Sequence, residues 1–107
     1  MAIQRKGPID KAQAIAIARQ TIAKASTHDH DMVIQEKKTE ERDFGWVFFY
    51  TTRKFLETGD KKYLVPGNAP LVVEREDGST HFLGTSLPPN RAIERFEQAW
   101  RERHGPR

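Results

Sequence analysis

Nine consecutive residues in the middle of the chain, residues 44–52, are almost all aromatic or β-branched. Such residues favour β-strands, because they pack well on a pleated and partly buried surface. Alternation along a strand separates two sets of side chains, Phe44, Trp46, Phe48 and Tyr50 on one face and Val47 and Phe49 on the other. Because both sets are apolar, we expect a central strand of the hydrophobic core. Contact of part of this surface with a partner is the alternative, since Trp and Tyr anchor interfaces well.

A helix is expected over residues 10–25. Asp10 is a suitable N-cap, Gln13 three residues later completes a capping box, and Ile9 is placed to pack on the first turn. The apolar stripe that follows is Ile15, Ala18, Ile22 and Ala25. Because the stripe is rich in alanine, this helix can lie close against a sheet.

A second helix is expected from the Pro88-Pro89 pair to about residue 103, with Ile93, Phe96 and Trp100 on one face. The strands expected between the helices are residues 32–38, 44–52, 71–75 and 80–84, the last two joined by a turn at Asp77-Gly78. Residues 36–43 are expected to form an exposed strand end and turn, and residues 53–70 a long loop with a short helical turn.

The order helix, four strands, helix predicts the fold class. Strands joined without crossover helices form antiparallel sheets. We therefore expect an α+β fold, with an antiparallel four-stranded sheet and an N-terminal and a C-terminal helix packed on one face. A chain of 107 residues is expected to form a single domain, residues 1–107.

Composition excludes several classes of protein. The chain has no cysteine, which excludes disulfide scaffolds, thiolate zinc sites and cysteine nucleophiles. The net charge of +3 is too small to indicate a nucleic-acid partner. No apolar run approaches the roughly 18 residues that span a bilayer, and no secretory signal pattern follows Met1. We expect a cytoplasmic protein that contacts neither nucleic acid nor membrane.

Residues 42–49 resemble the signature of the RNA-recognition motif, whose aromatic side chains stack on bases. Two residues depart from that signature, Asp43, which stands where it has glycine, and Trp46. No aromatic strand precedes these residues, and a loop and hairpin follow where the motif has a helix. The residues therefore favour a hydrophobic core over an RNA platform.

Other candidate sites are weak. The His-Asp-His-Asp run at residues 28–31 lies in a loop, where alternate neighbours rarely converge on one metal ion, and the other histidines are isolated. Carboxylate pairs such as Glu40-Glu41 stand among basic residues, as on a solvated surface. No nucleophile elbow, phosphate-binding loop or zinc-protease pattern occurs. We expect no enzymatic activity, no metal and no cofactor.

Five short blocks occur in order between residues 45 and 85. They are Gly45-Trp46 with Phe48, then Phe55-Leu56-Glu57-Thr58-Gly59-Asp60, then Gly67-Asn68-Ala69-Pro70, then Asp77-Gly78, and then Gly84-Thr85. In this series the chain resembles the YrhB-type family, also classed as immunity protein 35 of bacterial polymorphic toxin systems. No single block is specific, but a chance match of all five in order is improbable.

The resemblance implies a small α+β protein without enzymatic activity. Members encoded beside toxin genes are taken to bind and neutralise a cognate toxin. Other members stand alone, and a heat-stable, chaperone-like role has been attributed to one type. The family pattern contains no catalytic residues and does not identify the toxin.

The blocks also predict an ordered loop over residues 56–70. Gly59 and Gly67 permit a positive φ, Asn68 can form an Asx turn, and Pro70 restrains the start of the next strand. Phe55 and Leu56 are expected to pack this loop onto the sheet. The expected structural residues are Phe44, Trp46, Phe48, Phe55, Leu56, Gly59, Gly67, Asn68, Pro70 and Gly84.

The charged residues around this loop are then left pointing outward. The candidate partner-binding residues are Arg53, Lys54, Glu57, Asp60, Lys61 and Lys62. Charges on a stiff frame recognise a partner at little ordering cost. The leading interpretation is an immunity protein that covers the active site or substrate surface of its toxin. Residues 36–43 are an alternative interface, and the oligomeric state stays open.

Two other functions are alternatives. A small holdase would bind unfolded clients through exposed apolar surface. A small-ligand or enzyme-accessory module would require a pocket lined by convergent polar groups.

Overall fold

The computed structural model describes residues 8–26, 31–63, 69–84 and 86–104. In chain order the elements are α1 (Lys11–Ala25), β1 (Met32–Ile34), η1 (Glu36–Lys38), β2 (Glu40–Arg42), β3 (Gly45–Phe48), β4 (Tyr50–Thr52), α2 (Arg53–Thr58), η2 (Lys61–Tyr63), β5 (Leu71–Glu74), β6 (Thr80–Phe82) and α3 (Pro89–His104). Within these residues, strands β2-β3-β5-β6 form an antiparallel sheet, and β1 pairs with β4. The predicted α+β class is confirmed.

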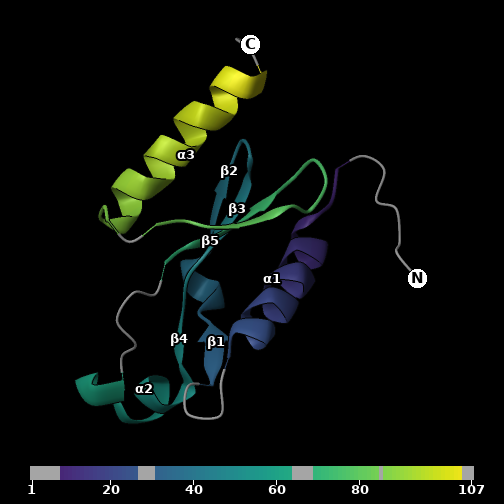
Figure 1. Ribbon diagram of the computed structural model, residues 1–107. Helices are drawn as coiled ribbons and strands as arrows, with labels where there is room; N and C mark the ends of the chain where they lie inside the picture. The colour runs from purple at the N-terminus through teal and green to yellow at the C-terminus, as the bar shows by residue number, and fades with distance from the viewer. Residues whose placement is uncertain (1–7, 27–30, 64–68, 85, 105–107) are drawn as a thin grey trace.

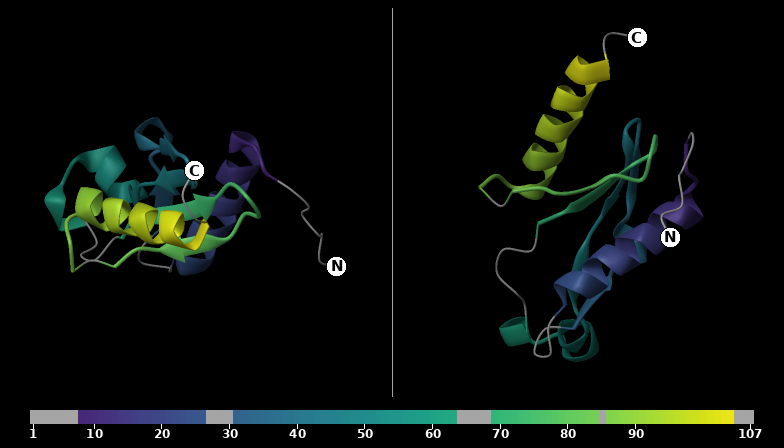
Figure 2. Two further views of the ribbon diagram at one scale, coloured as in Figure 1. Left: turned by 90° about the horizontal axis from the view of Figure 1, so that it is seen from above. Right: turned by 45° about the vertical axis from the view of Figure 1, so that its right-hand side comes forward.

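α1 and α3 cover opposite faces of the four-stranded sheet (Figure 1; right view of Figure 2). The side chains of β3 and β5 on the α1 face are Trp46, Phe48, Leu71 and Val73. Those on the α3 face are Val47 and Val72, which pack with Ile93 and Trp100. The expectation that both helices pack on one face is therefore wrong. Neighbouring strand residues point to opposite faces, and because both sets are apolar here, each face needs its own cover.

α1 begins as its sequence predicts. The carboxylate of Asp10 accepts a hydrogen bond from the Gln13 N–H at 2.8 Å, and the Asp10 N–H donates to the Gln13 amide oxygen at 2.9 Å. Ile9 is buried, and its N–H donates to the carbonyl oxygen of Arg75 at 2.8 Å. These bonds fix the start of α1 to the end of β5. The fully buried residues of α1 include two alanines, which bring the helix close to the sheet.

The aromatic run forms two strands rather than one. β3 ends at Phe48 and β4 begins at Tyr50, and the two strands belong to different sheets. Between them, the carbonyl oxygen of Phe49 accepts a hydrogen bond from the Gln35 N–H at 2.8 Å. The chain therefore passes from the main sheet to the β1-β4 pair within this run.

Phe44 packs on the α3 face with Val47, and not on the face of Trp46 as alternation predicts. Alternation fails because Gly45 follows with a φ of 147°, a conformation that side chains rarely adopt. A Cβ at Gly45 would overlap the carbonyl oxygen of Val73 on the neighbouring strand. Gly45 thus sets the face on which Phe44 is buried.

The described residues form six strands where the sequence predicts four. β2 lies within residues 36–43 and forms one edge of the main sheet by pairing with β3. β1, which was expected in the main sheet, pairs with β4 instead. A short charged strand such as β2 has no hydrophobic alternation, so local sequence does not reveal it.

Residues 53–63 form two short helices, α2 and η2, where a loop with one helical turn is predicted. α2 ends at Gly59 with a φ of 70°, so the predicted left-handed position is confirmed. Gly67 and Asn68 lie outside the described residues.

The β5-β6 hairpin turns at Gly78 with a φ of 79°, as predicted. The Asp77 carboxylate accepts hydrogen bonds from the Ser79 hydroxyl at 2.6 Å and the Ser79 N–H at 2.9 Å, which lower the pKa of Asp77. After the hairpin, α3 buries Ile93 and Trp100 as its periodicity predicts.

Candidate functional site

The six charged residues predicted to contact a partner lie on α2 and η2 and the turn between them, residues 53–63, which we call the α2–η2 cap. The cap forms one end of the molecule (Figure 1). Its exposed charged residues are Arg53, Lys54, Glu57, Asp60, Lys61 and Lys62. The outward placement expected for these residues is confirmed.

Hydrogen bonds hold the cap in one shape. The buried hydroxyl of Thr52 accepts from the Phe55 N–H at 3.1 Å and donates to the carbonyl oxygen of Tyr63 at 2.6 Å. The Asp60 carboxylate accepts from the Lys62 N–H at 3.0 Å. Because Thr52 of β4 bonds to both α2 and η2, the two short helices are tied to the β1-β4 pair. A surface ordered in advance loses little entropy when it binds.

The charges of the cap are mixed in sign. Arg53 pairs with Asp31 at 2.7 Å, and this hydrogen bond raises the pKa of Arg53. The ammonium groups of Lys54 and Lys62 lie 5.6 and 5.2 Å from the centroid of the Tyr63 ring. An aromatic ring attracts cations held over its face. The Tyr63 ring therefore lies within reach of two lysine ammonium groups of the cap.

Leu56 is half exposed on the cap, with an exposed fraction of 50%. The expectation that Leu56 packs against the sheet is wrong. Its neighbour Phe55 is partly buried, and the two differ because consecutive helical residues point in different directions. Among the described residues, Leu56 and Phe82 are the large apolar side chains that remain exposed.

The other predicted structural residues lie in the core or at its edge. Phe44, Trp46 and Phe48 are buried, so their rings are not available to stack on bases, and the core placement that the sequence favours over an RNA platform is confirmed. Pro70 is buried as well, whereas Gly84 is exposed.

The predicted metal-like run falls mostly outside the described residues, since 28–30 are not described. Asp31 pairs with Arg53. Among the described residues, no group of three or more His, Asp or Glu side chains is placed to hold a metal ion.

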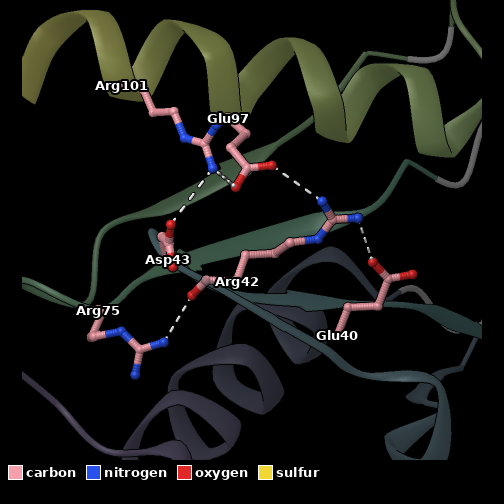
Figure 3. Close-up of polar contacts among 6 residues, drawn as sticks. All are labelled: Glu40, Arg42, Asp43, Arg75, Glu97 and Arg101. Carbon is pink, nitrogen blue, oxygen red and sulfur yellow. Dashed lines mark hydrogen bonds and ion pairs between the residues drawn. The ribbon is translucent and has the colours of Figure 1, made fainter. Parts of the chain in front are cut away.

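In the alternative interface, residues 36–43, most of the charged side chains form ion pairs with other residues of this chain, several of which Figure 3 shows. Arg42 donates to Glu40 at 2.9 Å and to Glu97 of α3 at 3.1 Å. The hydrogen bond to Glu40 is the largest contribution to the raised pKa of Arg42. Arg101 of α3 contacts both Glu97 at 3.2 Å and Asp43 at 3.6 Å.

This network joins α3 to the β2-β3 hairpin. Glu36 pairs with Arg19 of α1, and Glu41 pairs with Arg75 at 3.1 Å. Charges that already have partners contribute less to an interface, because a new partner must replace the existing contact. The network is therefore better explained as a structural tie than as a binding surface.

The structure also contains a hollow that sequence reasoning did not find. It is an open groove of about 300 Å³ beside α3, lined by Leu83, Gly84, Ser86, Leu87, Ala92, Arg95 and Phe96. Leucines after the last strand and an arginine beside the apolar stripe of α3 were the available signals. Whether the leucines and the arginine lie close together depends on how α3 packs on the sheet, which local sequence patterns do not predict.

Comparison with known proteins places the chain in a family. The sequence model of the family described as immunity protein 35 matches residues 12–103. The chain belongs to the immunity protein 35 family. The match runs from α1 to the end of α3 and so includes the cap, the network and the groove.

The chain is also similar to a protein of Escherichia coli (strain K12) described as "Uncharacterized protein YrhB". The two are 40% identical over 53 residues, which are 50% of this chain and 56% of the relative. The chain thus spans about half the length of the curated relative it matches. No solved structure matches the chain. In the part of the chain that the structure describes, none of the helices has the length and apolar character to cross a membrane.

Proposed function

We propose that the chain binds one cognate bacterial toxin and neutralises it by covering the toxin's active site or substrate surface. Membership of the immunity protein 35 family supports toxin binding. The α2–η2 cap supplies the surface that contacts the toxin.

The observation that carries this proposal is the exposure of Leu56 among the charged residues of the cap. Interfaces typically combine a central apolar anchor, which provides much of the binding energy, with a polar rim that excludes water. Leu56 supplies the anchor, and the rim includes Lys54 and Glu57.

The cap alone is smaller than a standard interface. Such an interface buries about 800 Å² on each partner and uses roughly 20–30 residues a side. The accessible surface of the chain is 7432 Å², so the toxin would cover about a tenth of it. The cap spans residues 53–63, so further residues outside it must take part.

A client-binding holdase requires a larger apolar surface than the structure displays. Exposed apolar patches of several hundred Å² mark such binding sites. Over the described ranges, the large apolar side chains left exposed are Leu56 and Phe82, on different elements. This distribution favours one specific partner over many unfolded clients.

Co-expression with the toxin encoded beside this gene tests the proposal. The wild-type chain should restore growth and co-purify with the toxin. Leu56→Ser should lose both properties while keeping its fold. Phe82→Ser is the matched control, since Phe82 is 48% exposed but lies on β6. If the wild-type chain gives neither rescue nor a complex, the proposed function is wrong.

A further inference from the structure

The groove beside α3 has rigid apolar walls. Phe96 packs edge-on against Phe44, with ring centroids 4.9 Å apart, and against His81 at 5.2 Å. One side of the Phe96 ring is thus held by the core while the ring lines the groove. Leu83 and Leu87 complete the walls and are partly buried. A groove held open in this way can receive an apolar side chain without rearrangement.

The arginines of α3 beside the groove form no ion pair within the part of the chain that the structure describes. Five described arginines form ion pairs, namely Arg19, Arg42, Arg53, Arg75 and Arg101. The described arginines that form no ion pair with a described residue are Arg91, Arg95 and Arg103, all on α3. Arg95 lines the groove itself.

Helical spacing places Arg91 and Arg95 together. Residues four apart lie on the same face of a helix, and about 6 Å separates them along its axis. Glu94, the nearest carboxylate in sequence, points to the side of α3 away from Ala92 and Phe96, at about 100° per residue. Glu94 lies three residues after Arg91 and so beside it on the helix surface, whereas none of the residues three or four positions from Arg95 is acidic. Arg95 therefore supplies the positive charge at the groove that no acidic side chain one turn away on α3 neutralises.

We propose that this groove binds a short acidic segment of a partner protein, with an apolar side chain in the groove and carboxylates on Arg95 and Arg91. Arginine pairs with carboxylates through two parallel hydrogen bonds, which fixes the position of a bound segment. The inference rests on the proposed function only in taking the toxin as the source of that segment.

The charge of the groove argues against the N-terminal segment of the chain itself as the occupant. Residues 1–7 carry Arg5 and Lys6 and no acidic side chain, so their charge repels that of Arg91 and Arg95.

The start of α3 and the α2–η2 cap lie on the same side of the molecule in all three views (Figures 1 and 2). One partner can therefore reach both surfaces, which supplies the contact area that the cap lacks.

The test uses a blocked acidic peptide, acetyl-Glu-Asp-Leu-Phe-Asp-Glu-amide, and amide NMR spectra of the full chain at about 0.15 M salt, where charges more than about 8 Å apart are largely screened. The peptide should shift the resonances of Leu83, Gly84, Ala92 and Phe96. Arg95→Glu should weaken binding roughly ten-fold, since a hydrogen bond between charged groups is lost. Arg103→Glu is the matched control, with the same charge change two turns further along α3, and should change affinity less than about two-fold.

Two further peptides separate charge from the apolar contact. A basic peptide, acetyl-Lys-Arg-Leu-Phe-Arg-Lys-amide, should not bind. An acidic peptide with Gly-Ser in place of Leu-Phe should bind several-fold more weakly. Arg95→Gln, which keeps a polar side chain, should weaken binding of the acidic peptide. The amide spectrum of the free variant should otherwise match that of the wild type.

Several results would overturn the inference. The first three are an absence of resonance shifts at millimolar acidic peptide, shifts confined to the cap, and equal binding of the basic peptide. Tighter binding of a single-stranded oligonucleotide would also contradict it. Shifts that depend only on protein concentration would make the occupant a second copy of the chain. Binding of the acidic peptide without rescue of growth in the presence of the toxin would support the inference about the groove and refute the proposed function. Neutralisation of the toxin without binding of the acidic peptide would support the proposed function and refute the inference about the groove.

Discussion

The guanidinium group of Arg75 lies over the indole ring of Trp46, with its central carbon 4.5 Å from the ring centroid. The same guanidinium donates a hydrogen bond to the carbonyl oxygen of Arg42 at 2.8 Å. The residue that directly follows β5 thereby covers the largest fully buried side chain and holds the β2-β3 hairpin. This contact links the core of the α1 face to the ion-pair network beneath α3.

Trp46→Ala should lower the free energy of unfolding by about 3–5 kcal/mol, because Trp46 is 1% exposed and its removal leaves a large cavity. Trp46→Phe should cost less, since a ring stays beneath Arg75 and a buried indole N–H that has no hydrogen-bond partner among the described residues is removed. Urea unfolding followed by circular dichroism measures both. A near-neutral Trp46→Ala with lost toxin binding would make Trp46 an interface anchor instead of a core residue.

Gly45→Ala should destabilise the protein by at least about 2 kcal/mol. A Cβ at this position would overlap the carbonyl oxygen of Val73 and lie 2.8 Å from the backbone nitrogen of Arg75, and φ is 147°. Gly84→Ala is the control, because its nearest neighbour atom, the Ser86 hydroxyl oxygen, would lie 4.0 Å from the new Cβ. Thermal unfolding of the two variants should separate clearly, and equal midpoints would contradict the tight packing at Gly45.

His104 should make stability depend on pH. Hydrogen bonds to the Glu76 carboxylate at 2.8 Å and the Trp100 carbonyl oxygen at 2.8 Å raise the pKa of His104 above its ordinary value of 6.5. A raised folded-state pKa means that the charged form stabilises the fold. This contribution is fully present below pH 6.5 and is lost as pH rises through the raised pKa.

The measurement is the urea midpoint of the wild type and His104→Gln from pH 5.5 to 9, at roughly half-unit steps. The wild type should be the more stable at the acidic end, and the difference should shrink as pH rises. Glu76→Gln should remove most of the same dependence. A difference that grows with pH would contradict the contact between His104 and Glu76.

Glu57→Lys should weaken toxin binding while changing the free energy of unfolding by less than about 0.5 kcal/mol, because Glu57 is exposed. Reversing a charge at an interface rim mainly slows association and changes its salt dependence. Glu94→Lys is the control, with the same charge change on α3 on the side away from the groove. Surface plasmon resonance at two salt concentrations distinguishes them, and equal association rates for both variants would move the interface away from the cap.

Local signals predicted the ends of the elements well. The Asp10–Gln13 capping box, the Asp77-Gly78 turn and the left-handed Gly59 each depend on residues a few positions apart. Residues so close in sequence meet whatever the tertiary arrangement, so their pattern is sufficient.

Features that depend on distant residues were missed. The apolar alternation of Val72 and Val73 is compatible with helices on one face or on both, and only packing decides. The face of Phe44 depends on the approach of Gly45 to Val73 on another strand.

In the candidate site too, features set by residues close in sequence could be predicted, and features set by tertiary packing could not. The outward charges of residues 53–62 could be predicted because polar residues in a turn-rich segment are solvated. The exposure of Leu56 could not be predicted, because it depends on how the short helix α2 orients its side chains. The α3 groove joins residues 83–87 to α3 and required the tertiary structure.

The most direct test of the account is a titration of the purified toxin's activity with the purified chain. We predict that activity falls in proportion to the added chain and is abolished at equimolar concentration, and that Leu56→Ser shifts this titration to a large excess. Full toxin activity in the presence of excess wild-type chain would contradict the central claim.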